Sequence, residues 1–124
     1  MSKFVIRTVP SGWKFDLHAS NGQIIATSEV YDSHSACVKG VQSVRKNART
    51  EKIDDHTEPG PKALTNPKYA LFLDKAGQFR FRLTARNGQT IAVSESYTTK
   101  AACENGIASV QKNAPDAEVS AGCF

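Results

Sequence analysis

The sequence has no CxxC pair, no glycine-rich phosphate loop and no long hydrophobic run. Without a CxxC pair, zinc-ribbon and thioredoxin-like sites lack the cysteines on which they depend. No segment approaches the ~20 consecutive apolar residues that a membrane-spanning helix needs. Residues 1–9 lack the apolar stretch of a secretory signal peptide and instead resemble a strand. These absences predict a cytoplasmic protein without membrane association.

The overall composition is that of an ordinary globular domain. The chain has 124 residues, of which 40% are hydrophobic and 23% are charged, and its formal net charge is +4. These proportions exclude disordered and fibrous proteins. The charge is unevenly distributed, with a net of +1 over residues 1–58 and +3 over residues 59–124.

The most informative feature present is an internal duplication. Residues 13–48 and 79–114 align without a gap at an offset of 66 positions, and 19 of the 36 aligned residues are identical. Such a period indicates a supersecondary unit that needs a partner to bury its apolar face. We call residues 1–54 the first repeat and residues 68–121 the second repeat. Residues 55–67 form a proline-rich linker, and we expect one domain over residues 1–124 with a single shared core.

Each repeat begins with a pattern of strands. We expect first strands at residues 3–9 and 68–73, and second strands at 13–20 and 79–86, where apolar and polar residues alternate. Asn21-Gly22 and Asn87-Gly88 then predict hairpins with type I′ turns, which need positive φ at both central residues. Third strands follow at residues 23–28 and 89–94.

A helix and a fourth strand complete each repeat. Ser33 and Thr99 are the expected N-caps. Gly40 and Gly106 lie on the apolar helix faces, where glycine is costly, and indicate close approach of helix and sheet. Asn47 and Asn113 suit the left-handed residue that closes a helix, and Lys46 and Lys112 favour the helix dipole. Fourth strands are expected at residues 50–54 and 116–120.

The sequence therefore predicts an α+β fold of two β-β-β-α-β units. Helices on one face of an antiparallel sheet give two layers. We expect both helices on the same face of one sheet, and a monomer with internal pseudo-twofold symmetry.

The second repeat resembles the YegP-like family of small uncharacterised bacterial proteins, in its duplicated branch. The resemblance rests on NGQ, SExY, AAC-x-x-GI and KNAPDA in that order, and the first repeat carries the pattern more loosely. It implies tandem units in one sheet, with the C-terminal strands exchanged between them. Single-repeat members would reach the same arrangement as dimers. The family supplies no activity and no functional residues.

The residues that could support catalysis do not form a recognisable constellation. Cys37 and Cys103 are equivalent residues on the apolar helix faces, where free cysteine acts as a small hydrophobe. His18, His34 and His56 have no counterpart histidine in the other repeat. His34 and Cys37 stand one helical turn apart, but two ligands do not make a zinc site. We therefore expect no enzyme, no metal and no cofactor; Cys123 is the plausible exposed thiol.

A shared Ser-Glu-x-Tyr motif precedes each helix and allows two interpretations. Glu29 and Tyr31 in the first repeat correspond to Glu95 and Tyr97 in the second. A carboxylate beside a helix N-terminus is stabilised by unpaired backbone N–H groups, which is a structural role. Alternatively, the four residues form a small-ligand site at the junction between the repeats.

A basic stripe is the sharpest functional hypothesis. Arg80, Arg82 and Arg86 alternate along the second strand of the second repeat, and Lys14 occupies the position equivalent to Arg80. If these side chains project from the open face of the sheet, they could bind a nucleic-acid backbone. The other interpretation is that a solvated sheet face simply carries charge. The sequence thus favours a small non-enzymatic binding protein, with nucleic acid or a junction ligand as the alternatives.

Overall fold

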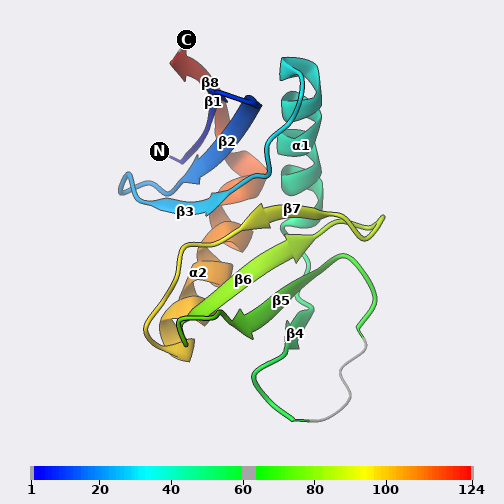
Figure 1. Cartoon of the computed structure of the whole chain (residues 1–124), viewed down its shortest axis with the longest axis vertical. Helices are drawn as coiled ribbons and strands as arrows, with labels where there is room; N and C mark the ends of the chain where they lie inside the picture. Colours follow the sequence, from blue (N-terminus) through cyan, green and yellow to red (C-terminus); the bar gives the residue numbers. More distant parts are fainter. Residues whose placement is uncertain (1, 60–63, 124) are drawn as a thin grey trace.

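The structure, a computed structural model, describes residues 2–59 and 64–123 and contains one sheet of eight strands with two helices. Figure 1 shows the elements in the colours of the sequence. In the first repeat they are β1 (Lys3–Val9), β2 (Gly12–His18), β3 (Ile24–Thr27), α1 (His34–Asn47) and β4 (Ile53–Asp55). In the second they are β5 (Lys68–Leu73), β6 (Phe79–Thr84), β7 (Thr90–Val93), α2 (Lys100–Asn113), the short 3-10 helix η1 (Ala114–Asp116) and β8 (Glu118–Cys123).

The sheet is mixed, so the prediction of a purely antiparallel sheet is wrong. Its strand order is β4-β5-β6-β7-β3-β2-β1-β8. The pairs β1–β2, β2–β3, β3–β7, β5–β6 and β6–β7 are antiparallel, but β4 pairs in parallel with β5 and β8 in parallel with β1. Residues 56–67 connect β4 to β5, which is about the length of connection that parallel neighbours require. The first and last strands, β1 and β8, lie side by side, with the N-terminus beside the start of β8 and the C-terminus at its far end (Figure 1).

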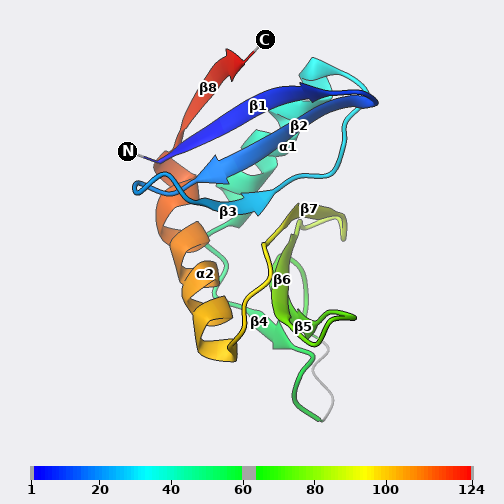
Figure 2. The ribbon, with the colours of Figure 1, turned by 60° about the vertical axis from the view of Figure 1, so that its left-hand side comes forward.

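The core lies between the sheet and the helices (Figure 2). Phe15 and Leu17 of β2 and Phe81 and Leu83 of β6 are fully buried, as their alternation predicts. Figure 2 also shows how strongly the sheet twists between the β1–β2 hairpin and the β5–β6 hairpin. We call the side of the sheet away from the helices the open face.

The helices begin as predicted and end differently. The side chains of Ser33 and Thr99 accept hydrogen bonds from the backbone N–H groups three residues later, so both N-caps are confirmed. No residue other than glycine has positive φ in the described ranges, so the left-handed role expected for Asn47 and Asn113 is wrong. Each asparagine side chain instead donates to the carbonyl four residues back, at 2.8 Å, and stays in the right-handed helical region.

The Asn-Gly turns are also not of type I′. Gly22 has φ of 87° and Gly88 of 88°, but the preceding asparagines keep negative φ. The N–H of Gly22 donates to the carbonyl of Ala19 at 2.9 Å, which closes a four-residue turn one position earlier than predicted. A turn followed by a left-handed glycine is the usual three-residue hairpin loop. The register shift after Leu17 accompanies this arrangement.

A tyrosine fills the gap opposite each helical glycine. The Tyr31 ring stacks on Phe15 with centroids 6.2 Å apart, and a Cβ atom added to Gly40 would lie 2.3 Å from the Tyr31 hydroxyl. Tyr97 occupies the equivalent position against Gly106, where the corresponding distance is 2.4 Å. The glycines thus make room for an inserted side chain as well as for the strand.

Several hydrogen bonds join one repeat to the other across the core. Gln111 of α2 donates to the carbonyl of Thr50 at 2.9 Å, and Arg45, the equivalent residue of α1, donates to the carbonyl of Ala117. Tyr69 of β5 donates to the carbonyl of Ala48 at 2.6 Å, just beyond α1. Each helix end is therefore fixed by the other repeat.

Candidate functional site

The open face carries one continuous row of paired residues across the centre of the sheet. Asp16 pairs with Thr27, Thr27 with Val93, Val93 with Arg82 and Arg82 with Ala70. Residues directly opposite one another in a ladder point to the same side of the sheet. Since adjacent strands lie about 4.8 Å apart, Asp16 and Arg82 are separated by roughly 14 Å along this row.

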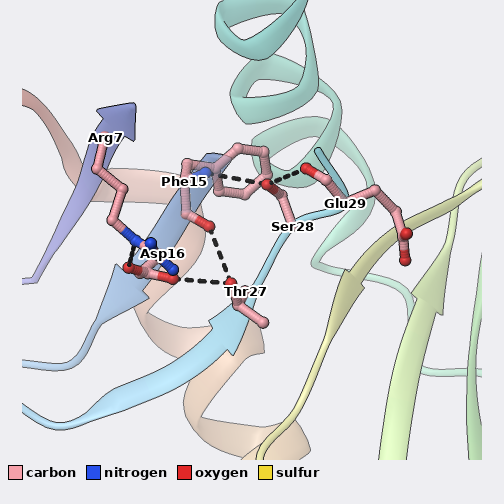
Figure 3. Close-up of polar contacts among 6 residues, drawn as sticks. All are labelled: Arg7, Phe15, Asp16, Thr27, Ser28 and Glu29. Carbon is pink, nitrogen blue, oxygen red and sulfur yellow. Dashed lines mark hydrogen bonds and ion pairs between the residues drawn. The ribbon is translucent and has the colours of Figure 1, made fainter. Parts of the chain in front are cut away.

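In the first repeat the open face is occupied by an internal ion pair. Figure 3 shows Arg7 Nε donating to Asp16 Oδ2 at 2.8 Å, while Thr27 Oγ1 donates to Asp16 Oδ1 at 2.7 Å. Asp16 is only 5% exposed, so it is not the solvated residue that the alternation predicted. The hydrogen bond to Asp16 and the charge of its carboxylate raise the pKa of Arg7. The carboxylate therefore neutralises one of the cations on this half.

In the second repeat the same positions carry cations without such a carboxylate. Arg82, aligned with Asp16, is exposed and places its guanidinium 4.5 Å from the ring centroid of Phe72. Arg80 lies directly opposite Phe72 on the neighbouring strand and donates from Nη2 to the carbonyl of Ser94 at 2.9 Å. The Nε atom of Arg80 is buried and has no hydrogen-bond partner among the described residues. Phe72, Arg80 and Arg82 form one cluster, which we call the arginine–phenylalanine cluster.

The remaining members of the predicted stripe lie elsewhere. Lys14 is half-buried in β2 and lies opposite Arg7, in the other half of the sheet from Arg80 and Arg82. Arg86 lies beyond the end of β6, in the turn over residues 85–88, where it lines a hollow against α1. The alternation that predicted a three-arginine stripe ends at Thr84, because the chain turns at the following residue.

A second paired carboxylate lies on β4, at the edge of the sheet beside β5. Asp54 of β4 lies opposite Ala70 and is 2% exposed. Its Oδ2 atom is 2.9 Å from Lys68 Nζ and 3.3 Å from His56 Nε2. Sequence reasoning missed both carboxylate pairs, since each joins residues on neighbouring strands.

The serines of the Ser-Glu-x-Tyr motif have a structural role. Ser28 Oγ accepts from the N–H of Phe15 at 2.9 Å and donates to the carbonyl of Glu29 at 2.7 Å (Figure 3). Ser94 makes the same two bonds to Phe81 and Glu95. Each serine therefore bridges the irregular end of its strand, where the ladder alone would leave an N–H group unpaired.

The glutamates and tyrosines of the motif line two separate hollows. Glu29 and Tyr31 lie beside residues 89–91 of the second repeat, in a hollow of about 350 Å³. Glu95 and Tyr97 lie beside residues 22–25 of the first repeat, in one of about 580 Å³. Burial, together with the nearby cysteine and glutamate, raises the pKa of both tyrosines. The structure thus divides the four predicted junction residues into two pairs.

The cysteines and histidines do not form a metal site in the part of the chain that the structure describes. Cys37 and Cys103 are free and fully buried, and burial is the main cause that raises the pKa of Cys103 to about 11. Within residues 2–59 and 64–123, no three His, Cys, Asp or Glu side chains gather closely enough to hold a metal ion. The side chain of Cys123 lies outside the described residues.

The comparisons place the chain among known proteins. A family model described as a domain of unknown function, DUF1508, matches residues 11–55 and residues 74–120. The chain belongs to the DUF1508 family. Among DUF1508 relatives, a UPF0339 protein from Bordetella pertussis is 40% identical over 114 residues, covering 92% of this chain and 89% of the relative. A UPF0339 protein from Treponema denticola is 58% identical over 52 residues, which cover 42% of this chain and 90% of the relative.

Two solved structures share the mixed α+β fold. The solution NMR structure of YegP from E. coli, a protein of unknown function, has a TM-score of 0.77 at 31% identity, covering 98% of this chain and 92% of YegP. That of a UPF0339 protein from Shewanella oneidensis has a TM-score of 0.79 at 30% identity, covering 97% and 90%. The resemblance to YegP-like proteins is thus confirmed at the level of the family, which has no established function.

Neither α1 nor α2 combines the length and the apolarity that crossing a membrane requires, and the described residues contain no other α-helix.

Proposed function

We propose that this chain is a small non-enzymatic binding protein that holds single-stranded nucleic acid on the second-repeat half of its open face. The observation that supports the proposal is the arginine–phenylalanine cluster. Arg82 is exposed and stacks on Phe72, and Arg80 lies directly opposite the same ring. Aromatic rings and guanidinium planes stack on unpaired bases, and arginine also binds phosphate. Duplex binding would instead depend on phosphate contacts alone.

The first-repeat half is less suited to this role. Arg7, a half-buried cation beside the central row, is already paired with Asp16. Phe72 is replaced there by Arg7 itself, so no aromatic ring occupies the corresponding position. We therefore assign the binding to Arg80 and Arg82, with Lys14 at the far side of the sheet as an accessory phosphate contact.

The architecture that we propose to support this function is a monomer in which two repeats exchange their last strands. The parallel pairing of β4 with β5, and of β8 with β1, supports the exchange. The buried free thiols of Cys37 and Cys103 suit the reducing cytoplasm. A ligand at Glu29, Tyr31, Glu95 and Tyr97 would have to reach both hollows to contact all four residues.

The test is binding of a labelled 12-nucleotide single strand, measured by fluorescence anisotropy over a range of salt concentrations. Arg80→Gln/Arg82→Gln should weaken binding at low salt and lower the slope of log K against log salt by about 1.4, because each phosphate contact on a single strand contributes about 0.7. Phe72→Leu should weaken binding about tenfold by removing one stacking partner, with little change in the slope.

A matched control removes the same charge from the helical layer. Arg49→Gln/Lys112→Gln replaces two exposed cations near the ends of α1 and α2 and should leave the affinity nearly unchanged. The proposal fails if wild type does not bind at low salt, or if both double variants lose the same affinity. Equal binding of single strand and duplex would reject the stacking part of the proposal.

A further inference from the structure

The hollow between α1 and the turn over residues 85–88 has features that the proposed nucleic-acid surface does not use. Its volume is about 520 Å³. Helix α1 contributes Lys39, Gln42, Ser43 and Lys46, and the turn contributes Arg86 and Asn87.

The cations of this hollow lack an ion-pair partner among the residues that the structure describes. Lys39, Lys46 and Arg86 have no ion pair with any described acidic residue, and no acidic residue lines the hollow. Lys39 and Lys46 are two turns apart on one face of α1, or about 10 Å along its axis. Arg86 adds a third charge from the neighbouring turn. A concave surface lined by one sign of charge concentrates ions of the opposite sign.

The neutral polar residues around these cations have their acceptor groups occupied. Gln42 Oε1 accepts from Arg45, and Ser43 Oγ accepts from Asn47 at 3.3 Å. Asn87 Oδ1 accepts from the N–H of Gln89 at 3.0 Å. The Gln42 amide hydrogens and the Ser43 hydroxyl hydrogen remain as donors, whereas Asn47 uses its amide hydrogens on residue 43. Donors without competing acceptors favour an anionic ligand.

The other half of the molecule provides an internal comparison. The equivalent hollow, between α2 and the turn of the first repeat, has a volume of about 380 Å³ and is lined by a single cation, Lys112. Ser20 stands there in place of Arg86, and Ala108 in place of Gln42. Lysine in the last helical turn is explained by the helix dipole. Lys39 and Arg86 have no such explanation, so the fold itself does not require them.

We propose that the hollow between α1 and the turn over residues 85–88 binds an organic phosphate or diphosphate, with its oxyanion held by Lys39, Lys46 and Arg86. Pro67 and the buried Ala85 supply an apolar wall for the organic part of the ligand. The Ser43 hydroxyl and the Gln42 amide donate the accompanying hydrogen bonds. The site is separate from the arginine–phenylalanine cluster and does not depend on the proposed nucleic-acid function.

The probes are sodium pyrophosphate and phenyl phosphate, titrated at constant ionic strength with sodium chloride as the reference salt. Binding is followed by changes in the ¹H–¹⁵N spectrum and by isothermal titration calorimetry. We expect saturable shifts centred on Gln42, Ser43 and Asn87, with one site per chain. Lys39→Gln/Arg86→Gln should weaken binding at least tenfold, and Lys112→Gln, the matched control, should leave it within about twofold.

A gain-of-function variant completes the test. Ser20→Arg/Asn105→Lys places cations in the first-repeat turn and at the α2 position aligned with Lys39, and should raise the stoichiometry toward two. The side chains substituted around the two hollows are exposed, so circular dichroism should show unchanged folding for these variants: Ser20, Lys39, Arg86, Asn105 and Lys112. The proposal is overturned if the titrations do not saturate by 20 mM probe, or if Lys39→Gln/Arg86→Gln binds as well as wild type. Loss of oligonucleotide binding in Arg80→Gln/Arg82→Gln with retained pyrophosphate binding separates this site from the open face.

Discussion

At the scale of single residues, identical side chains in the two repeats are mostly explained by packing. The pair of Tyr31 and Gly40 is the clearest example, since the ring lies between strand and helix and its hydroxyl would lie 2.3 Å from an added Cβ atom. A glycine at this position therefore does not signal flexibility. It accommodates the ring that stacks on Phe15.

Gly40→Ala should consequently destabilise the protein. In an unobstructed helix the change would stabilise by about 1 kcal/mol, but here overpacking should reverse the sign and cost about 1–3 kcal/mol. Urea denaturation of the single variants and of Gly40→Ala/Tyr31→Ala measures the effect. In the Tyr31→Ala background most of this cost should disappear, because the remaining close neighbour of the added Cβ atom is Phe15 Cε2, at 3.1 Å. Ser35→Ala, at an exposed position of α1, controls for helix propensity; a stabilising Gly40→Ala would contradict the packing model.

At the scale of elements, local patterns predicted structure well and long-range pairing poorly. The first strands, the N-caps and the buried faces of β2 and β6 depend on residues close in the sequence, and these predictions are confirmed. The Asn-Gly turns were misassigned because the same dipeptide can serve a two-residue or a three-residue loop. The choice between them depends on where the ladder ends.

The parts of the site that escaped prediction involve residues far apart in the chain. Arg7 and Asp16 meet because β1 and β2 pair, and Phe72 meets Arg82 because β5 and β6 pair. One signal was present, since Asp16 aligns with an arginine in the other repeat. What that difference meant could be seen only once the strand neighbours of both residues were known.

The first turn of α2 is tied to the chain around β4 by charge. Lys100 forms ion pairs with Asp55 and with Glu58. Burial alone would raise the pKa of Asp55, but hydrogen bonds from Lys100 and Thr57 outweigh it and lower the pKa to about 2. The junction therefore depends on an ionised carboxylate.

This arrangement predicts a specific dependence of stability on pH. Because the pKa of Asp55 is lower in the folded state than the value of about 3.9 for an unfolded chain, its contribution is complete above pH ~4 and is lost as the pH falls toward 2. Chemical denaturation at several pH values should show a smaller loss over that range for Asp55→Asn than for wild type. Asp55→Asn/Lys100→Met should follow Asp55→Asn. Parallel curves for wild type and Asp55→Asn would contradict the assignment.

At the scale of the whole molecule, the two repeats are held together by more than their linker. β4 joins the second-repeat half of the sheet and β8 joins the first, while Arg45 and Gln111 bond to backbone carbonyls beyond the opposite helix. The centre of the sheet adds the antiparallel contact between β3 and β7. Separating the halves would therefore expose sheet edges and core on both sides.

A chain cut in the linker should remain assembled. With a protease site inserted between Pro59 and Leu64, the cleaved protein should elute from a sizing column as one species and separate only in denaturant. Its unfolding should become concentration-dependent, losing about 1.4 kcal/mol for each tenfold dilution, since dissociation now accompanies unfolding. The uncleaved protein is the control. Two half-sized peaks under native conditions would show that the strand pairings do not hold the halves together.

The linker also changes what mutation can do to this fold. A homodimer of single repeats would carry every substitution twice, once on each side of its symmetry axis. In the joined chain a substitution changes one repeat only. Aligned positions can therefore differ, as Asp16 differs from Arg82 and Lys39 from Asn105. Because the repeats are joined in one chain, their sequences no longer have to be identical. The open face shows the result, since Asp16 pairs with Arg7 in the first repeat while the aligned Arg82 stays exposed in the second.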